Sequence, residues 1–322
     1  MADLGELVAQ QVAGGGDTSS SACMFAVWNL IVQPPRRRYT QEELMGEYPQ
    51  ERFEVRGQLV HRSDFGLANA RGLELACTLF EPAAREGAQR AGAKERACVV
   101  FCHGSGSCRL AGFELVPLLL PLNIGLACFD FAGSGMSGGD YASLGFHERK
   151  DLGCVVEHLR SRGFSRVGLW GRSTGAASAL MHAARDPSIA GLVADSPFSD
   201  AWDLLAEICQ DVLGLKPWLV SPFLHMLRLI VQSQAEFDIR EVSPRAHVRS
   251  CFVPALFLHG ELDSFVAPWH SELLQRSYGG EAQRLRMPRA THDSRRPGEF
   301  LARAAAFLVR ALRWERQLPV GA

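Results

Sequence analysis

The chain has 322 residues, of which 47% are hydrophobic and 21% charged, and its net charge is −1 at pH 7. These values are typical of globular proteins, and one large α/β domain with an insertion can fill this length. A net charge near zero gives no electrostatic reason to bind nucleic acid, so no partner of that class is expected. The nine cysteines lack CxxC pairs and histidine-rich spacing, which predicts free thiols in a cytoplasmic protein rather than disulfides or a zinc site.

Residues 1–40 are predicted to be an appendage. Residues 14–21 are rich in Gly and Ser and predict a flexible hinge, while residues 24–32 form an apolar stretch that Pro34 and Pro35 end. Nine apolar residues are too few to span a membrane, and the preceding residues lack the pattern of a secretory signal. We expect this stretch to pack on the body of the protein, with peripheral membrane contact as the alternative because three arginines follow it.

The sequence next predicts strands. Residues 51–60 and 73–81 alternate polar and apolar side chains, as half-buried antiparallel strands do. Short continuous apolar runs follow at residues 97–103, 125–131, 166–171, 190–195 and 253–259, separated by segments of helical periodicity. This alternation predicts an α/β fold over residues 41–199 and 251–322, with a mostly parallel sheet flanked by helices. Ligands of such sheets bind at the carboxyl ends of the strands.

A glycine-rich loop at residues 133–138 matches the dinucleotide fingerprint G-x-G-x-x-G. That fingerprint belongs to the first strand of its unit and opens directly into a helix. Here earlier strands precede the loop, and the next helix is predicted to start only near Leu144. We therefore interpret residues 133–138 as a loop at a strand end and expect no nucleotide cofactor.

The segment around Ser173 has the order of a nucleophile elbow. A buried strand at residues 167–170 leads into Gly171-Arg172-Ser173-Thr174-Gly175, and a helix is predicted over residues 176–185. The two glycines are needed because side chains there would collide with the neighbouring strand and helix. Ser173 is therefore the candidate nucleophile, with its hydroxyl above the sheet.

A serine hydroxyl needs a base and an acid that orients the base. Asp263 and His292 each follow a later strand, so Ser173, Asp263 and His292 have the chain order of an α/β-hydrolase triad. Asp195 also ends a strand and is the alternative acid. Among the other histidines, His259 is expected to be buried and structural.

Three more histidines, at positions 147, 158 and 182, fall in helical segments and are expected to pack or to face solvent. Acyl transfer also needs two N–H donors for the carbonyl oxygen that becomes negative. The backbone N–H of Thr174 is one candidate, and that of Ser105, after an early strand, is the other.

Residues 200–250 are predicted to be a helical cap insertion, because this connection is longer than usual. Residues 201–214 and 216–234 are typical of two helices, and the second is apolar around most of its circumference. Such a helix is buried or faces a ligand. We expect part of it to cover the body and the rest to wall an acyl-binding pocket above Ser173.

From about residue 34 onwards the chain resembles the α/β-hydrolase superfamily, specifically the serine aminopeptidase-like and prolyl-oligopeptidase-related group of plants and protists. The phrases FCHGSGSCR, FDFAGSGMSGGDY, LWGRSTGAASALM, IAGLVADSPFSD, CFVPALFLHGELDSFVAP and HDSRRP carry this resemblance. It implies the same triad and the same oxyanion donors. Two departures, Ala290 where relatives often have glycine and Thr174 where many have methionine, leave the catalytic groups in place.

Together these observations predict a serine hydrolase that cleaves acyl esters or thioesters of a small-molecule or lipid-like substrate, without metal or organic cofactor. A peptidase is one alternative, and it would need an acidic site for the peptide amine. Glu207, Asp211 and Glu236 are the acidic residues of the cap considered for it. A non-catalytic binding protein with a hydrolase fold is the other alternative, although the chain retains every triad member.

Overall fold

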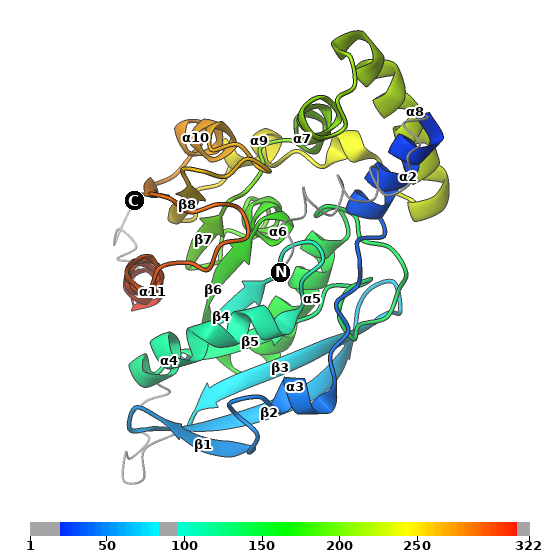
Figure 1. Ribbon diagram of the computed structural model, residues 1–322. Helices are drawn as coiled ribbons and strands as arrows, with labels where there is room; N and C mark the ends of the chain where they lie inside the picture. Colours follow the sequence, from blue (N-terminus) through cyan, green and yellow to red (C-terminus); the bar gives the residue numbers. More distant parts are fainter. Residues whose placement is uncertain (1–19, 84–95, 314–322) are drawn as a thin grey trace, which may run out of the picture.

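One mixed sheet runs through the computed structural model, which describes residues 20–83 and 96–313 (Figure 1). In this part of the chain the sheet has nine strands, in the order β1-β2-β3-β5-β4-β6-β7-β8-β9. Their bounds are β1 (Arg52–Val55), β2 (Gln58–Ala68), β3 (Glu74–Pro82), β4 (Arg96–Cys102), β5 (Gly125–Phe129), β6 (Phe164–Arg172), β7 (Gly191–Asp195), β8 (Ala255–Gly260) and β9 (Ala282–Met287). Strands β1, β2, β3 and β5 pair antiparallel in that order, and every later pair is parallel, which confirms the predicted sheet.

The burial of the strands follows their sequence patterns. Strands β5, β7 and β8 are buried at every residue, as expected for continuous apolar runs covered on both faces. The prediction of one strand at residues 51–60 is wrong, because the chain turns at Arg56 and Gly57, both with positive φ, and forms the antiparallel pair β1 and β2. Strand β2 alternates between buried and exposed residues and continues to Ala68. Its polar residues are accommodated there because the buried Arg62 donates to Asp64 (2.9 Å) and to the carbonyl oxygens of Tyr48 (2.7 Å) and Leu44 (2.9 Å).

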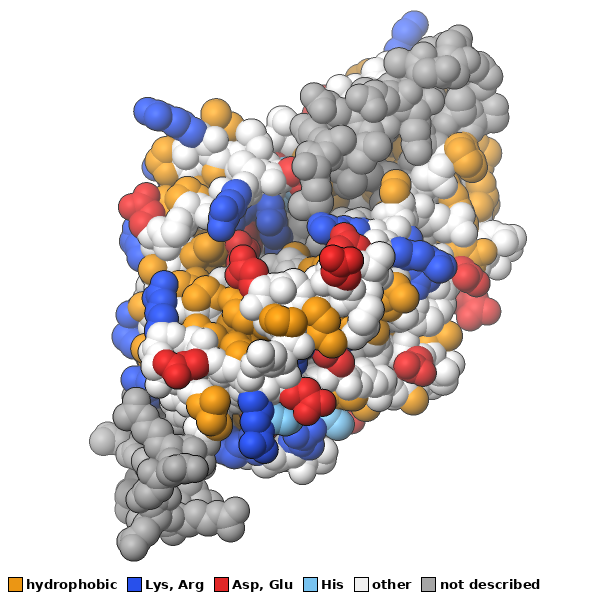
Figure 2. All heavy atoms as spheres, turned by 60° about the horizontal axis from the view of Figure 1, so that its bottom comes forward, with side chains coloured by type: hydrophobic (Ala, Val, Ile, Leu, Met, Phe, Trp, Pro, Cys, Tyr) orange, Lys and Arg blue, Asp and Glu red, His pale blue; other side chains and the backbone are white. Residues whose placement is uncertain are grey.

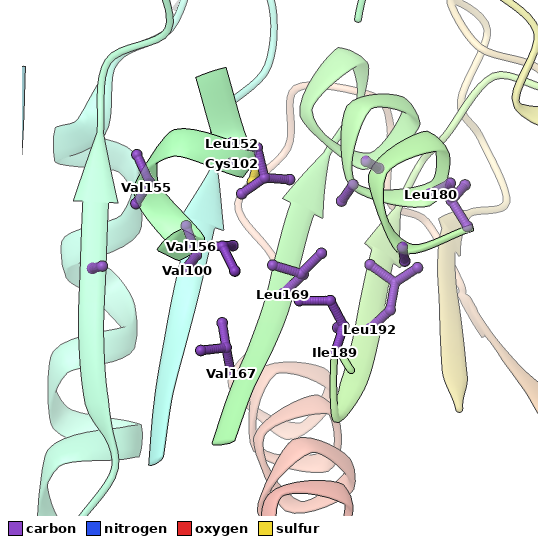
Figure 3. Close-up of a cluster of buried hydrophobic side chains, with 14 of the residues drawn as sticks. Val100, Cys102, Leu152, Val155, Val156, Val167, Leu169, Leu180, Ile189 and Leu192 are labelled. Carbon is purple, nitrogen blue, oxygen red and sulfur yellow. The ribbon is translucent and has the colours of Figure 1, made fainter. Parts of the chain in front are cut away.

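Helices cover both faces of the sheet. One face carries α5 (Glu148–Ser161), α6 (Thr174–Ala183), α9 (Pro244–Val248) and α10 (Trp269–Arg276), and the other carries η1 (Arg109–Leu115), α4 (Val116–Leu119), η2 (Leu120–Leu122) and α11 (Gly298–Arg313). Figure 3 shows the first layer, where Val156 of α5 lies beside Val100 of β4, and Leu180 of α6 lies near Leu192 of β7. These side chains exclude water from the sheet, and each contributes roughly 1.5–3 kcal/mol of burial free energy.

A further helical layer lies above the carboxyl ends of the parallel strands (Figure 1). It consists of α2 (Ser20–Ile31), α7 (Ala201–Glu207), the π-helical η3 (Ile208–Val212) and α8 (Pro217–Ala235), followed by η4 (Ile239–Glu241). Val27 and Ile31 of α2 are buried in one apolar cluster with Leu224 and Leu227 of α8. The N-terminal helix therefore packs on the body, as expected. It begins at Ser20, inside the predicted hinge, whose residues 14–19 lie outside the described residues.

The chain between α2 and α3 (Gln41–Met45) is tied to the Gly/Ser loop that resembles a dinucleotide fingerprint. Arg36 donates to the carbonyl oxygens of Gly135 (2.8 Å), Gly139 (3.0 Å), Ser134 (3.3 Å) and Ser137. The loop thus presents hydrogen-bond acceptors to a cation, whereas a phosphate would need N–H donors. This geometry agrees with its interpretation as a structural loop.

Helix α5 begins at Glu148, so the prediction of a start near Leu144 is wrong. Leu144 has a φ of 54°, which a right-handed helix cannot include. The Glu148 carboxylate accepts hydrogen bonds from the backbone N–H groups of Ser143 (2.7 Å) and Gly145 (2.8 Å). These bonds stabilise a turn that holds the chain out of the helix until residue 148.

Charged side chains of both signs are interspersed over the face shown in Figure 2, as a net charge of −1 leads one to expect. Within residues 20–83 and 96–313, no helix combines the length and the apolar character that crossing a bilayer requires. 

Candidate active site

Ser173 occupies a strained turn between β6 and α6. Its φ of 54° lies in the left-handed region, which a residue other than glycine rarely adopts. A Cβ atom at Gly171 would lie 2.4 Å from the carbonyl oxygen of Gly175, and one at Gly175 would lie 2.1 Å from that of Cys102. The glycines are therefore required by close approach of α6 and of the end of β4, which confirms the steric argument from the sequence.

The structure brings Ser173, His292 and Asp263 into one chain of hydrogen bonds. The Ser173 Oγ lies 3.0 Å from His292 Nε2, and His292 Nδ1 lies 2.7 Å from Asp263 Oδ2. Because a carboxylate accepts, Nδ1 carries the ring proton and leaves Nε2 free to accept the proton of the serine hydroxyl. Ser173 and His292 are each only 7% exposed, so little water competes for these bonds.

Asp263 is held in place by further donors. Its Oδ1 accepts from the backbone N–H groups of Val266 (2.8 Å) and Phe265 (3.1 Å). His259 Nε2 lies 2.8 Å from the carbonyl oxygen of Val266 and 3.3 Å from Asp263 Oδ2, so its proton is shared between them. Burial alone would raise the pKa of Asp263, but hydrogen bonds from His259 and His292 outweigh burial and lower this pKa. Asp263 is therefore an anion at neutral pH. His259 is buried as expected, and its contact with Asp263 is a feature that the sequence reasoning missed.

The alternative acid, Asp195, has a different partner. Both of its carboxylate oxygens accept from Arg296, Oδ2 from Nε at 2.8 Å and Oδ1 from Nη2 at 2.9 Å. Burial alone would raise the pKa of Asp195, but the charge and hydrogen bonds of Arg296 outweigh burial and lower it. The His292 ring bonds to Asp263 instead. The sequence could not separate the two carboxylates because Arg296 lies 101 positions from Asp195.

Ser105 and Thr174 line one small cavity beside the serine, together with Leu144 and with Ile31 of α2. Thr174 is the first residue of α6, and the first N–H groups of a helix have no partner inside that helix. The loop that carries Ser105 runs directly against the serine, since a Cβ atom at Gly104 would lie 3.2 Å from the Ser173 Cβ. Two candidate N–H donors thus border the same space. The sequence does not predict the contribution of Ile31, because it assigns residues 1–40 to an appendage.

His103 anchors the loop that carries Ser105. Its Nε2 accepts from the backbone N–H of Phe131 (3.1 Å), so Nδ1 carries the ring proton and donates to the carbonyl oxygen of Gly104 (2.8 Å). Burial lowers the pKa of His103, which keeps the ring neutral. This buried histidine therefore joins the end of β4 to the end of β5. The sequence reasoning used the His-Gly pair only to locate the loop.

A mostly parallel sheet, helices on both faces, and a serine on a sharp turn between strand and helix define the α/β-hydrolase fold. Solved structures agree. An esterase of Pyrococcus furiosus superposes with a TM-score of 0.62 at 22% identity, covering 87% of this chain and 99% of that one. A puromycin-hydrolysing peptidase of Mycobacterium tuberculosis gives a TM-score of 0.60 at 20% identity, covering 79% of this chain and 40% of that one.

Sequence comparisons agree with the fold. A family model described as serine aminopeptidase, S33, matches residues 93–249. An uncharacterised protein of Bacillus subtilis is 30% identical over 180 residues, which is 55% of this chain and 58% of that protein. The chain thus spans somewhat less than two thirds of the length of this curated relative. The chain therefore has the α/β-hydrolase fold, as its sequence motifs predict, and its residues 93–249 resemble the serine aminopeptidase family.

Proposed function

We propose that the protein is a serine hydrolase that cleaves acyl ester or thioester bonds through an acyl-enzyme intermediate. The observation that carries this proposal is the hydrogen-bond chain from Ser173 through His292 to Asp263 at the carboxyl edge of the sheet. This arrangement supplies a nucleophile, a base and an acid in the order that acyl transfer requires.

The proposed reaction has two halves. The Ser173 Oγ attacks the carbonyl carbon while His292 Nε2 takes the hydroxyl proton, and His292 then gives this proton to the leaving alcohol or thiol. Asp263 orients the imidazole and stabilises its charged form. A water molecule, deprotonated by His292, attacks the acyl carbon, the bond to Ser173 Oγ breaks, and His292 returns the proton to this Oγ as the carboxylic acid leaves. The backbone N–H groups of Ser105 and Thr174 stabilise the negative oxygen in both halves.

Residues 200–250, together with α2, form the cap of the proposed enzyme, over a core made of residues 41–199 and 251–322. The inner side chains of α8 pack in the apolar cluster that also contains Ala177 of α6. Ile31 reaches the cavity beside Ser173. The apolar character of this cap favours a small-molecule or lipid-like acyl substrate. Phe25 on α2 and Trp218 and Leu229 on α8 are exposed, which favours peripheral contact with lipid.

The proposed location is a reducing compartment, the cytoplasm. Seven cysteines are free thiols, and all of them except Cys154 are buried: Cys77, Cys98, Cys102, Cys108, Cys128, Cys154 and Cys251. Burial raises the pKa of Cys77 to about 12, so this thiol stays protonated and unreactive at neutral pH.

A peptidase of the aminopeptidase type is the second candidate, because the matching family model carries that description and a neighbouring solved structure is a peptidase. The same triad performs both reactions, and the leaving group is an amine instead of an alcohol. The ester hydrolase would place an apolar acyl chain against the cap, whereas the peptidase would place a charged peptide amine there.

The first test is labelling with a fluorophosphonate, which reacts with activated serines, followed by mapping of the adduct. We expect the wild type to be labelled at Ser173, and Ser173→Ala and His292→Ala to remain unlabelled. Ser161→Ala, at the exposed end of α5, is the matched control and should label like the wild type. A folded wild type without any adduct would overturn the proposal.

A substrate panel then separates the candidates. Acyl esters of increasing chain length should be hydrolysed with kcat/KM values that depend on chain length, because an apolar pocket gains roughly 0.8 kcal/mol per buried methylene. Indifference to chain length would contradict the acyl pocket. Faster cleavage of aminoacyl amides than of every ester would select the peptidase.

A further inference from the structure

Two arginines hold the loop that carries His292. This loop, residues 288–297 between β9 and α11, contains no helix or strand. Arg172, the residue before the proposed nucleophile, donates through Nη2 to the carbonyl oxygens of His292 (2.9 Å) and Ser294 (3.4 Å). The end of β6, which leads into Ser173, is therefore also hydrogen-bonded to the backbone of His292.

Arg296, which lies in the same loop, makes the second set of hydrogen bonds to its backbone. Its Nη1 donates to the carbonyl oxygens of Thr291 (2.9 Å) and Ser294 (3.1 Å). Its Nε and Nη2 bond to the Asp195 carboxylate, and Nη2 also lies 3.1 Å from the Ser196 Oγ. All five N–H donors of the guanidinium thus have acceptors in a buried site.

Asp195 connects this arginine to the nucleophile. The backbone carbonyl oxygen of Asp195 accepts from the N–H of Ser173 at 2.8 Å, while its side chain holds Arg296. One residue at the end of β7 is thus bonded both to the nucleophile turn and to the arginine of the His292 loop. The bidentate ion pair has a fixed geometry, which a single ammonium group could not reproduce.

We propose that Arg172 and the Asp195–Arg296 pair are positioning residues that set the His292 imidazole against Ser173. This inference rests on the proposed serine hydrolase activity. The side-chain bond to Asp263 orients the imidazole ring, but it leaves the backbone of an irregular loop free to shift. The arginines bind the carbonyl oxygens at residues 291, 292 and 294 and remove this freedom. Displacing a reacting group by about 1 Å can cost roughly 100-fold in rate.

The test compares Arg172→Gln, Arg172→Lys and Arg296→Lys with wild type in the full-length chain. Arg96→Gln is the matched control, because Arg96 also donates to a carbonyl oxygen, that of Arg162 (2.7 Å), but at the opposite end of the sheet. The kcat and KM for an ester that the wild type hydrolyses are measured, with the fraction of folded protein taken from circular dichroism.

We expect Arg172→Gln to lower kcat about 10-fold to 100-fold per folded molecule, with KM within about 2-fold of wild type. Arg172→Lys should recover part of this loss, because one ammonium donor can still reach the His292 carbonyl. Arg296→Lys should lower kcat at least as much, and if it does not fold, the Arg172 variants alone decide. Arg96→Gln should leave kcat within about 2-fold.

The positioning role is overturned if wild type hydrolyses the ester and Arg172→Gln keeps its kcat. It is also overturned if Arg172→Gln and Arg96→Gln lose activity equally, in proportion to unfolded protein. Failure of the wild type itself to react with the fluorophosphonate would be a different result, since it would overturn the hydrolase proposal and this inference with it.

Discussion

At the carboxyl edge of the sheet, side chains are held by hydrogen bonds of fixed direction, whereas α2 and α8 of the helical layer contact each other through apolar side chains. His292 and Asp195 each bond to charged partners at the edge, at 2.7 Å to Asp263 and 2.8 Å to Arg296. In the layer, Val27, Leu224 and Leu227 share one cluster without directional contacts. Packing of that kind tolerates small shifts that a hydrogen-bonded edge does not.

The difference suggests a division of labour. An edge with little positional freedom suits the proposed chemistry, and an apolar contact that tolerates small shifts suits substrates of different sizes. Variants of the edge should therefore reduce turnover in a folded protein, and variants of the layer should reduce stability while sparing the reactivity of Ser173.

The largest expected effect is that of Asp263→Asn. The asparagine preserves the shape but offers an amide donor to His292 Nδ1, which favours the wrong ring tautomer, so kcat should fall about 10⁴-fold. Steady-state ester hydrolysis measures this loss. Asp186→Asn, at a surface pair with Arg160, is the control and should behave like wild type. A kcat for Asp263→Asn within tenfold of wild type would show that Asp263 is not the acid.

Leu224→Ala in α8 tests the layer. Leu224 is fully buried, so its truncation should lower the free energy of unfolding by about 2–5 kcal/mol, measured by urea denaturation. The folded fraction should still react with a fluorophosphonate at the wild-type rate. Leu229→Ala on the exposed side of the same helix is the matched control, with a change within about 0.5 kcal/mol. Loss of labelling in folded Leu224→Ala would contradict the separation of the two regions.

Asp151 provides a contrast to the two carboxylates of the edge. Burial and the neighbouring Glu148 raise the pKa of Asp151 to about 6, although the N–H of Ala132 and the side chain of Asn69 donate to it. Because its folded pKa lies above the unfolded value near 3.9, its contribution to stability is complete below about pH 4 and is lost as the pH rises through about 6.

Asp151→Asn should remove this dependence on pH, because asparagine does not titrate. The unfolding free energy of wild type, relative to the variant, should fall by on the order of 2 kcal/mol between pH 4 and pH 7. Urea denaturation at several pH values measures it. For Asp263, whose pKa is lowered, the sign is reversed, and the stabilisation is present above about pH 4 and lost in acid. A pH-independent difference for Asp151→Asn would show that folding does not raise the pKa of Asp151.

The fold and the arrangement of Ser173, Asp263 and His292 could be predicted because strand ends and glycines leave local patterns. Ser173 lies between two glycines that contact backbone, and this steric requirement is visible as spacing in the sequence. The relation of Asp195 to Arg296 could not be predicted, because it joins the end of β7 to a loop 101 positions later. The contact of Ile31 with the cavity could not be predicted either, because periodicity identifies the apolar face of a helix but not the residues that pack against it.

The bond between His292 and Ser173 spans 119 positions of the chain, and this separation has a consequence during synthesis. Ribosomes add roughly 5–20 residues per second, so the codon for the serine is read roughly 6–24 s before that of the histidine. Throughout this interval the nascent chain contains the hydroxyl but not the group that activates it. Under the proposed mechanism, the growing polypeptide therefore cannot attack acyl groups in its surroundings until residue 292 has been made.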